Sequence, residues 1–169
     1  MKYNCSGMKW HGQHSKRFAR NTKNIMLIGE YRHTMDEKNR LSLPAKFRKE
    51  LGKKIIMTRG LDRCLFIYQL AEWKKFSQKL GALSIGSAEG RGFSRALLGG
   101  AMEIDVDASG RMLVPDHLKS YANLSTKVVV AGISNRVELW NEESWNNYTS
   151  GVENEANTLA QKLSDIGMI

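Results

Sequence analysis

The amino-acid sequence predicts an α+β fold in which two tandem βββαβ-type repeats combine, with helices flanking them. Three observations support this prediction. One segment occurs twice in the chain, short runs of alternating apolar residues end at turn-forming residues, and an aromatic helical pattern closes each copy. The chain has 169 residues, of which 41% are hydrophobic and 25% charged. These values are typical of a globular protein, and the length suffices for one sizeable core or two small ones.

Two segments of twenty residues carry the internal repeat. GEYRHTMDEKNRLSLPAKFR, residues 29–48, matches GAMEIDVDASGRMLVPDHLK, residues 100–119, at an offset of 71. Self-similarity of this kind indicates that one structural unit is used twice. The identical pairs are Gly29 with Gly100, Asp36 with Asp107, Arg40 with Arg111 and Pro44 with Pro115, and after one inserted residue Trp73 aligns with Trp145.

The repeat divides the chain into five parts. We expect repeats over residues 26–80 and 98–150. Residues 81–97 are expected to form a linker that contains a helix. Residues 151–169 are expected to form a C-terminal helix or tail. Residues 1–25 are expected to be a basic, disordered N-terminal extension.

Each copy is expected to begin with a hairpin. Residues 27–35 alternate weakly between apolar and polar side chains, which is typical of a strand. Asp36 is expected to open a turn by accepting backbone N–H bonds, as is Asp107 in the second copy. Asn39 and Gly110 occupy the same aligned position of the repeat. These two residue types best tolerate the positive φ that closes a type I turn with a bulge. The strands that re-enter are residues 40–43 and 111–114.

Proline is expected to begin a short helix after each hairpin. Pro44 and Pro115 suit the first helical turn, and Gly52 suits the end of the first of these helices. The remaining elements are strands 54–58 and 64–68 with closing helix 71–80, and strands 127–131 and 137–140 with a closing helix capped by Asn141. The aromatic residues that share one face of the closing helices, and that we expect to be core rather than a ligand platform, are Trp73, Phe76, Trp145 and Tyr148.

Two further helices are expected outside this common unit. Residues 92–98 have a helical composition and join the copies. Residues 152–163 are moderately helical and polar, which predicts a solvated tail helix.

Positive charge is concentrated toward the N-terminus. The chain has 26 lysines and arginines against 17 acidic residues, a formal net charge of +9, which favours an anionic partner. Residues 1–25 contribute +6, residues 26–99 contribute +8, and residues 100–169 contribute −5. The two copies therefore differ in charge although they agree in pattern.

The N-terminal 25 residues lack apolar periodicity, so they cannot bury enough surface to offset their ordering entropy. One interpretation is a basic arm that binds phosphate. The interpretation we favour is an extension from an upstream start codon, with Met26 as the usual first residue. His11 and His14 form an isolated H-x-x-H, which is too few ligands to predict a metal site.

The repeated D-x-x-x-R motif has two interpretations. As structure, the aspartate caps the turn and the arginine pairs back to it across the mouth of the hairpin. As function, the arginine projects from the hairpin and reads a base or grips a phosphate. The planar fork of arginine suits both, because it binds a carboxylate or the O6 and N7 atoms of guanine bidentately.

The motifs together resemble the MraZ family of bacterial transcriptional regulators. The resemblance rests on MLIGEYRHTMDEKNRLSLPAKFR, TRGLDRCLFIY and Trp73 in the first copy, and on DASGRMLVPDHLK and VVVAGISNRVELW in the second. It covers residues 26 to about 160. It implies an AbrB/MazE-like swapped-hairpin fold, a double-split β-barrel in which the two copies of one chain form a pseudo-dimer. It also implies a ring of several subunits that binds repeated short boxes of double-stranded DNA in the promoter of the division and cell-wall operon.

The arginine of the motif is the position that contacts DNA in this family, and the resemblance carries that role to Arg40 and Arg111. Basic residues surround Arg40 in the sequence, whereas Glu103, Asp105 and Asp116 lie near Arg111. Because phosphate binding is driven by local positive charge, we expect the first copy to face DNA and Arg111 to be mainly structural or at a subunit interface. The candidate DNA-binding residues are Arg32, Lys38, Arg40, Lys46, Arg48 and Arg111.

We therefore expect a sequence-specific, DNA-binding transcriptional regulator that is cytoplasmic and nucleoid-associated. The alternative is a ring-forming protein-interaction or antitoxin-like module without promoter specificity of its own. Recognisable catalytic motifs are missing, so we expect no enzyme, catalytic residue, cofactor or small-molecule substrate. Two cysteines, Cys5 and Cys64, form no CxxC pair, so we expect no metal, and no apolar run is long enough to predict a membrane segment.

Overall fold

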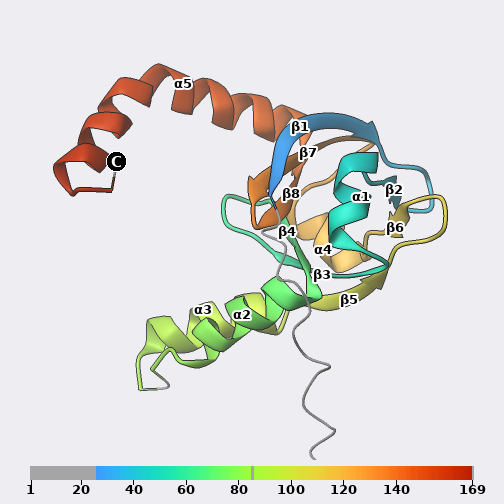
Figure 1. Ribbon diagram of the computed structural model, residues 1–169, viewed down its shortest axis with the longest axis horizontal. Coiled ribbons are helices and arrows are strands. Elements are labelled where there is room, and N and C mark those ends of the chain that lie inside the picture. The colour runs from blue at the N-terminus through green and yellow to red at the C-terminus, as the bar shows by residue number, and fades with distance from the viewer. Residues whose placement is uncertain (1–25, 85, 169) are drawn as a thin grey trace, which may run out of the picture.

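The computed structural model of the chain describes residues 26–84 and 86–168 (Figure 1). The basic segment 1–25, with His11 and His14, lies outside this range. In the first copy the elements are β1 (Leu27–Thr34), β2 (Arg40–Ser42), α1 (Ala45–Leu51), β3 (Lys54–Arg59), β4 (Leu65–Gln69) and α2 (Leu70–Gly81). Helix α3 (Ala88–Leu98) follows, and the second copy contains β5 (Met102–Asp105), β6 (Arg111–Leu113), α4 (Asp116–Tyr121), β7 (Lys127–Ser134), β8 (Arg136–Asn141) and α5 (Glu142–Asp165).

The two copies interlock in one antiparallel sheet. Its six strands have the order β1-β7-β8-β4-β3-β5, and β2 pairs with β6 in a separate two-stranded ribbon. The sequence repeat maps β1 onto β5, β2 onto β6, β3 onto β7 and β4 onto β8, so the strand order is the same from either edge. Each copy thus gives its first strand to the third strand of the other, with Leu27–Thr34 paired to Lys127–Ser134 and Lys54–Met57 paired to Met102–Asp105. The predicted α+β pseudo-dimer of two tandem repeats is confirmed.

Three details of the elements differ from the prediction. Each copy runs ββαββα rather than βββαβ, since two strands and not three precede the short helix, which is N-capped by Pro44 or Pro115 as the prolines predicted. Helix α3 begins at Ala88 rather than residue 92, since the Ser87 hydroxyl caps it by accepting from the N–H of Gly90 at 3.1 Å. Helix α5 runs unbroken from Glu142 to Asp165, so the closing helix and the tail helix are one element.

The main core lies inside the barrel, beneath the ribbon and the two short helices. Apolar positions that align in the repeat are equally buried in both copies, with at most 1% of each residue exposed. They are Leu41 with Met112, Leu43 with Val114, and Phe47 with Leu118. This core belongs to neither copy alone, because each hairpin covers strands of the other.

Aromatic residues form a second cluster on the outer face of the sheet. Tyr68 stacks on Phe76 at a centroid distance of 5.2 Å, and Trp140 lies 5.4 Å from Trp145. Trp73, Phe76 and Trp145 are partly buried against this cluster, as predicted for core residues. Tyr148 lies 5.1 Å from Trp140 between ring centroids but is 45% exposed, so the prediction that it belongs to the core is wrong. Helices α2 and α5 are thereby attached to equivalent places on the sheet.

Gly132 sits where β7 meets the edge strand β1, opposite Gly29. A Cβ atom at Gly132 would lie 2.7 Å from the backbone carbon of Leu27 and 2.7 Å from Cζ of Phe47. Both neighbours are fully packed, so neither has room to yield.

We expect Gly132→Ala to lower the free energy of unfolding by about 1–3 kcal/mol, because overpacking forces β1 away from β7. Gly151→Ala is the matched control. A Cβ there meets nothing within 4 Å, and helix propensity should raise stability by up to about 1 kcal/mol. Chemical denaturation of both variants measures the two effects, and equal stabilities would contradict this packing.

Candidate nucleic-acid interface

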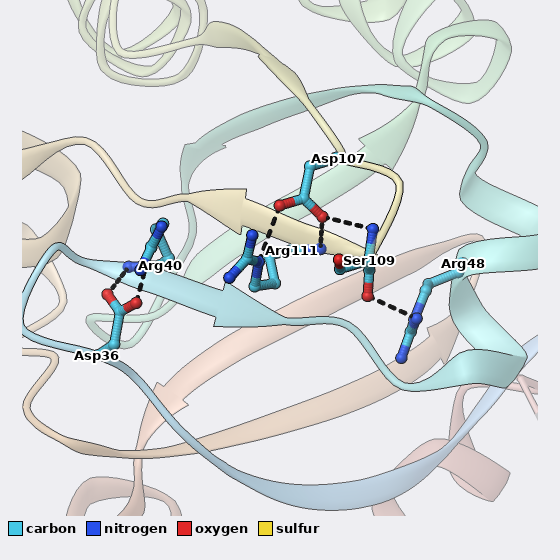
Figure 2. A network of polar contacts seen from close by, with 6 residues as sticks. All are labelled: Asp36, Arg40, Arg48, Asp107, Ser109 and Arg111. Atoms are coloured by element: carbon cyan, nitrogen blue, oxygen red, sulfur yellow. Dashed lines mark hydrogen bonds and ion pairs between the residues drawn. The ribbon is translucent and has the colours of Figure 1, made fainter.

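The β2–β6 ribbon places the two motif arginines on one surface (Figure 2). Arg40 pairs with Leu113 and Ser42 pairs with Arg111, while Leu41 and Met112 pair between them. Side chains alternate between the two faces of a strand. Because Leu41 and Met112 point into the core, Arg40 and Arg111 both point outward, at diagonal positions of a single face. Leu113 shares that face and is 54% exposed.

In the first copy, Asp36 holds both the turn and the arginine. Its Oδ1 accepts the backbone N–H groups of Lys38 at 2.9 Å and Arg40 at 2.8 Å, and its Oδ2 accepts Nε of Arg40 at 2.7 Å. The backbone N–H and then the guanidinium of Arg40 hold the pKa of Asp36 below its usual value. The carboxylate is therefore ionised at neutral pH and can keep this arrangement.

The second copy repeats the same geometry. Asp107 accepts the backbone N–H groups of Ser109 at 2.8 Å and Arg111 at 2.9 Å, and Nε of Arg111 at 2.8 Å. The same hydrogen bonds, led by the Arg111 backbone N–H, lower the pKa of Asp107. Asn39 has φ 57° and Gly110 has φ 78°, as predicted for the residue that closes each turn.

The structural interpretation of D-x-x-x-R is thus confirmed, and it leaves room for the functional one. Each aspartate binds Nε of its arginine, which fixes the direction of the guanidinium. Within the described residues, Nη1 and Nη2 of Arg40 and Arg111 have no hydrogen-bond partner. The side chains are 39% and 41% exposed, so these outer nitrogens are available to a ligand.

Each turn is also held by the other copy. The carbonyl of Asn39 accepts the N–H of Val114 at 2.9 Å, and the carbonyl of Gly110 accepts the N–H of Leu43 at 2.9 Å. These two bonds are equivalent under the repeat. They fix the tip of each hairpin to the end of the opposite ribbon strand.

Side chains from the short helices strengthen these contacts. Arg48 of α1 donates from Nε to the carbonyl of Leu43 at 2.7 Å. Its Nη1 donates to the carbonyl of Ser109 at 2.8 Å (Figure 2). In α4, Lys119 donates to Oδ1 of Asn39 at 2.6 Å, and Asp116 accepts Nδ2 of Asn39 at 2.6 Å. The positioning roles of Lys119 and Asp116 were not predicted. The signal for Lys119 was present, because positions 48 and 119 align and are both basic.

The six candidate DNA-binding residues are not gathered in one place. Arg40 and Arg111 lie on the ribbon, and Lys38 lies beside Arg40 in the first turn. Arg48 of α1 holds the second turn through its hydrogen bond to the carbonyl of Ser109. Lys46 of α1 donates to the carbonyl of Ile28 at 3.5 Å.

Arg32 lies on β1 and is bound by groups outside the ribbon. Its guanidinium contacts Glu30 at 2.7 Å, Asn146 at 3.1 Å and Glu142 at 3.4 Å. The structure therefore concentrates the candidate site on Arg40, Arg111 and Lys38. The two arginines have matching geometry, and the expected division of labour between the copies stays a prediction.

Two further findings concern metal binding and membrane insertion. Within residues 26–84 and 86–168, His, Cys, Asp and Glu form no group of three or more that could hold a metal ion. Among the helices of that same part of the chain, none combines the length and apolarity needed to cross a membrane.

Comparison with known proteins identifies the family. A family model described as "MraZ protein, putative antitoxin-like" matches residues 26–96 and again residues 97–165. A relative from Carboxydothermus hydrogenoformans is 46% identical over 140 residues, which is 83% of this chain and 98% of the relative. Relatives from Caldanaerobacter subterraneus and Caldicellulosiruptor saccharolyticus are 43% and 45% identical over 143 residues, 85% of this chain and 100% of each relative. All three are named transcriptional regulator MraZ. The chain belongs to the MraZ family, whose repeated unit it contains twice.

Proposed function

We propose that this protein is a non-enzymatic transcriptional regulator that binds double-stranded DNA sequence-specifically through the β2–β6 ribbon. The observation that carries the proposal is the pair of outward arginines, Arg40 and Arg111, each oriented by its own aspartate on one ribbon face. The family resemblance adds the target, which is a set of repeated short boxes in the promoter of the division and cell-wall operon. It also adds the assembly, a ring-shaped homo-oligomer that acts in the cytoplasm at the nucleoid.

The ribbon has the right form for direct base readout. The major groove of B-DNA is about 12 Å wide and admits a two-stranded β-ribbon. Nη1 and Nη2 of each arginine form a fork that can donate to O6 and N7 of one guanine. Because the aspartate already holds Nε, less side-chain entropy is lost on binding than for a free arginine.

The other residues of the ribbon face have supporting roles. Leu113 can contact the methyl group of a thymine, which is the apolar feature of the major groove. Lys38 projects from the turn beside Arg40 and can bind the phosphate backbone. These contacts are few, so one ribbon should bind weakly, and several ribbons on one assembly raise affinity by engaging repeated boxes together.

A second function is favoured by one observation. The exposed Leu113 at the end of the ribbon, opposite Arg40, would also suit a protein partner, as in a ring-forming interaction or antitoxin-like module. A salt series separates the two functions. Affinity for DNA through several phosphates falls steeply with salt concentration, whereas an apolar protein contact does not.

We expect Arg40→Ala and Arg111→Ala each to weaken binding to a box-containing duplex by about 5- to 150-fold. Each removes one bidentate guanine contact, worth about 1–3 kcal/mol. Lys127→Ala is the matched control, because it removes one positive charge from a side chain that is 76% exposed outside the ribbon. Its affinity should change less than either arginine variant.

Fluorescence anisotropy with wild-type and scrambled boxes measures these affinities, and circular dichroism checks that the variants are folded. A loss for Arg40→Ala with none for Arg111→Ala would restore the division of labour that charge alone predicts. Losses no greater than that of Lys127→Ala for both arginines would contradict the ribbon as the DNA-binding surface.

Spacing between boxes should matter as much as their sequence. Inserting half a helical turn, about five base pairs, rotates one box to the opposite side of the duplex. We expect affinity for the two-box duplex to fall toward that of a single box. An insertion of a full turn is the control, and affinity that ignores both insertions would contradict simultaneous engagement.

A further inference from the structure

Two helical arms leave the barrel, and the described part of the chain covers little of either (Figure 1). One is α5, 24 residues long, which has no buried residue. The other is the hairpin of α2 and α3, in which only Leu80 and Leu97 are buried. Beyond the aromatic residues that attach them to the sheet, the surfaces of both arms are left largely uncovered by residues 26–84 and 86–168.

The distal half of α5 carries an apolar stripe. Val152, Ala156, Leu159, Leu163 and Ile166 follow one another at intervals of four, three, four and three residues. That spacing is the a and d pattern of a helix that packs against another helix. Val152 is 39% exposed and Ile166 is 67% exposed, so the stripe is uncovered within the described chain.

The internal symmetry shows that, in the part of the chain that the structure describes, α5 lacks the packed neighbour that its counterpart α2 has. Helices α2 and α5 are equivalent, since each is attached to the sheet by its aligned tryptophan, Trp73 or Trp145. In the first copy, α3 folds back on α2, and the Ser94 hydroxyl donates to the carbonyl of Leu80 at 3.1 Å. No described element packs on α5 in the same way.

The two arms have opposite charge. Helix α5 has five acidic residues and one lysine, a net charge of −4. Glu153 and Glu155 flank its apolar stripe, at the positions that set partner choice in helix pairs. Residues 70–98 of the hairpin have five basic and two acidic residues, a net charge of +3.

The hairpin also offers apolar surface. Phe93 on α3 is 41% exposed and Leu83, after the end of α2, is 39% exposed. Lys74 and Lys79 are exposed on α2 of the same arm. The acidic α5 arm with its apolar stripe and the basic α2–α3 hairpin are thus complementary in charge and in apolar surface.

We infer that the acidic α5 arm of one subunit docks on the basic α2–α3 hairpin of the next subunit. Such an interface is head-to-tail, because the two surfaces that meet are different, and a head-to-tail interface forms a closed ring when its rotation closes. This inference deepens the ring-shaped assembly of the proposed function by naming the surfaces that build it. It does not depend on whether the ribbon binds DNA.

Charge reversal tests the pairing directly. The arm variant Glu153→Lys with Glu155→Lys and the hairpin variant Lys74→Glu with Lys79→Glu should each shift the full-length protein from multimer toward the mass of one chain. Mixing the two variants should restore assembly, because each arm then finds a complementary hairpin on the other variant. A chain with all four substitutions should also assemble by itself. Light scattering after size-exclusion chromatography measures the masses.

The control is Lys49→Glu with Lys53→Glu, which makes the same charge change on exposed lysines outside both arms and should leave the multimer intact. Four results would overturn the inference: a monomeric wild type, arm or hairpin variants that remain fully assembled, a mixture that stays dissociated, or a four-substitution chain that stays dissociated. Anisotropy on a one-box duplex, run on the same samples, keeps the DNA proposal separate. That affinity should be unchanged in dissociated variants, whereas a wild type that assembles without binding DNA would contradict only the DNA proposal.

Discussion

The pairing of β2 with β6 is the interaction on which the rest of the structure depends. Each strand has three residues and belongs to a different repeat, so neither could form a stable hairpin with its own copy alone. The pairing exists because each turn is fixed to the opposite repeat, through the bonds from Val114 to Asn39 and from Leu43 to Gly110. The barrel core and the shared arginine surface both follow from this exchange.

Much of the fold could be predicted because the repeat supplies two independent sequences for one structure. Asp36 and Asp107 marked the turns, and the shared slot of Asn39 and Gly110 marked the positive φ. Contacts between the copies could not be predicted in detail, because the same local patterns are compatible with pairing inside a copy or across copies. Helix α5 was divided wrongly for a local reason, since one exposed glycine, Gly151, costs only about 1 kcal/mol and does not end a well-capped helix.

Charge along the sequence did not predict which basic side chains the fold places together. Proximity in the sequence grouped Arg32, Lys46 and Arg48 with Arg40, yet the fold directs these three to a carboxylate pair, a strand carbonyl and the opposite turn. At the ribbon each arginine is balanced by its aspartate, so the local net charge says little. What distinguishes the candidate site is the orientation of its arginine side chains, because two guanidinium groups held by aspartates share one face of the ribbon.

The central claim is that both repeats deliver their arginines to bases in one major groove. Guanine N7 methylation interference on a promoter box tests it most directly, when wild type is compared with Arg40→Ala and Arg111→Ala. We predict that methylation of two guanines blocks wild-type binding, and that each variant becomes insensitive to a different one of the two. Interference that is the same for all three proteins, or that is confined to the minor groove, would contradict the account.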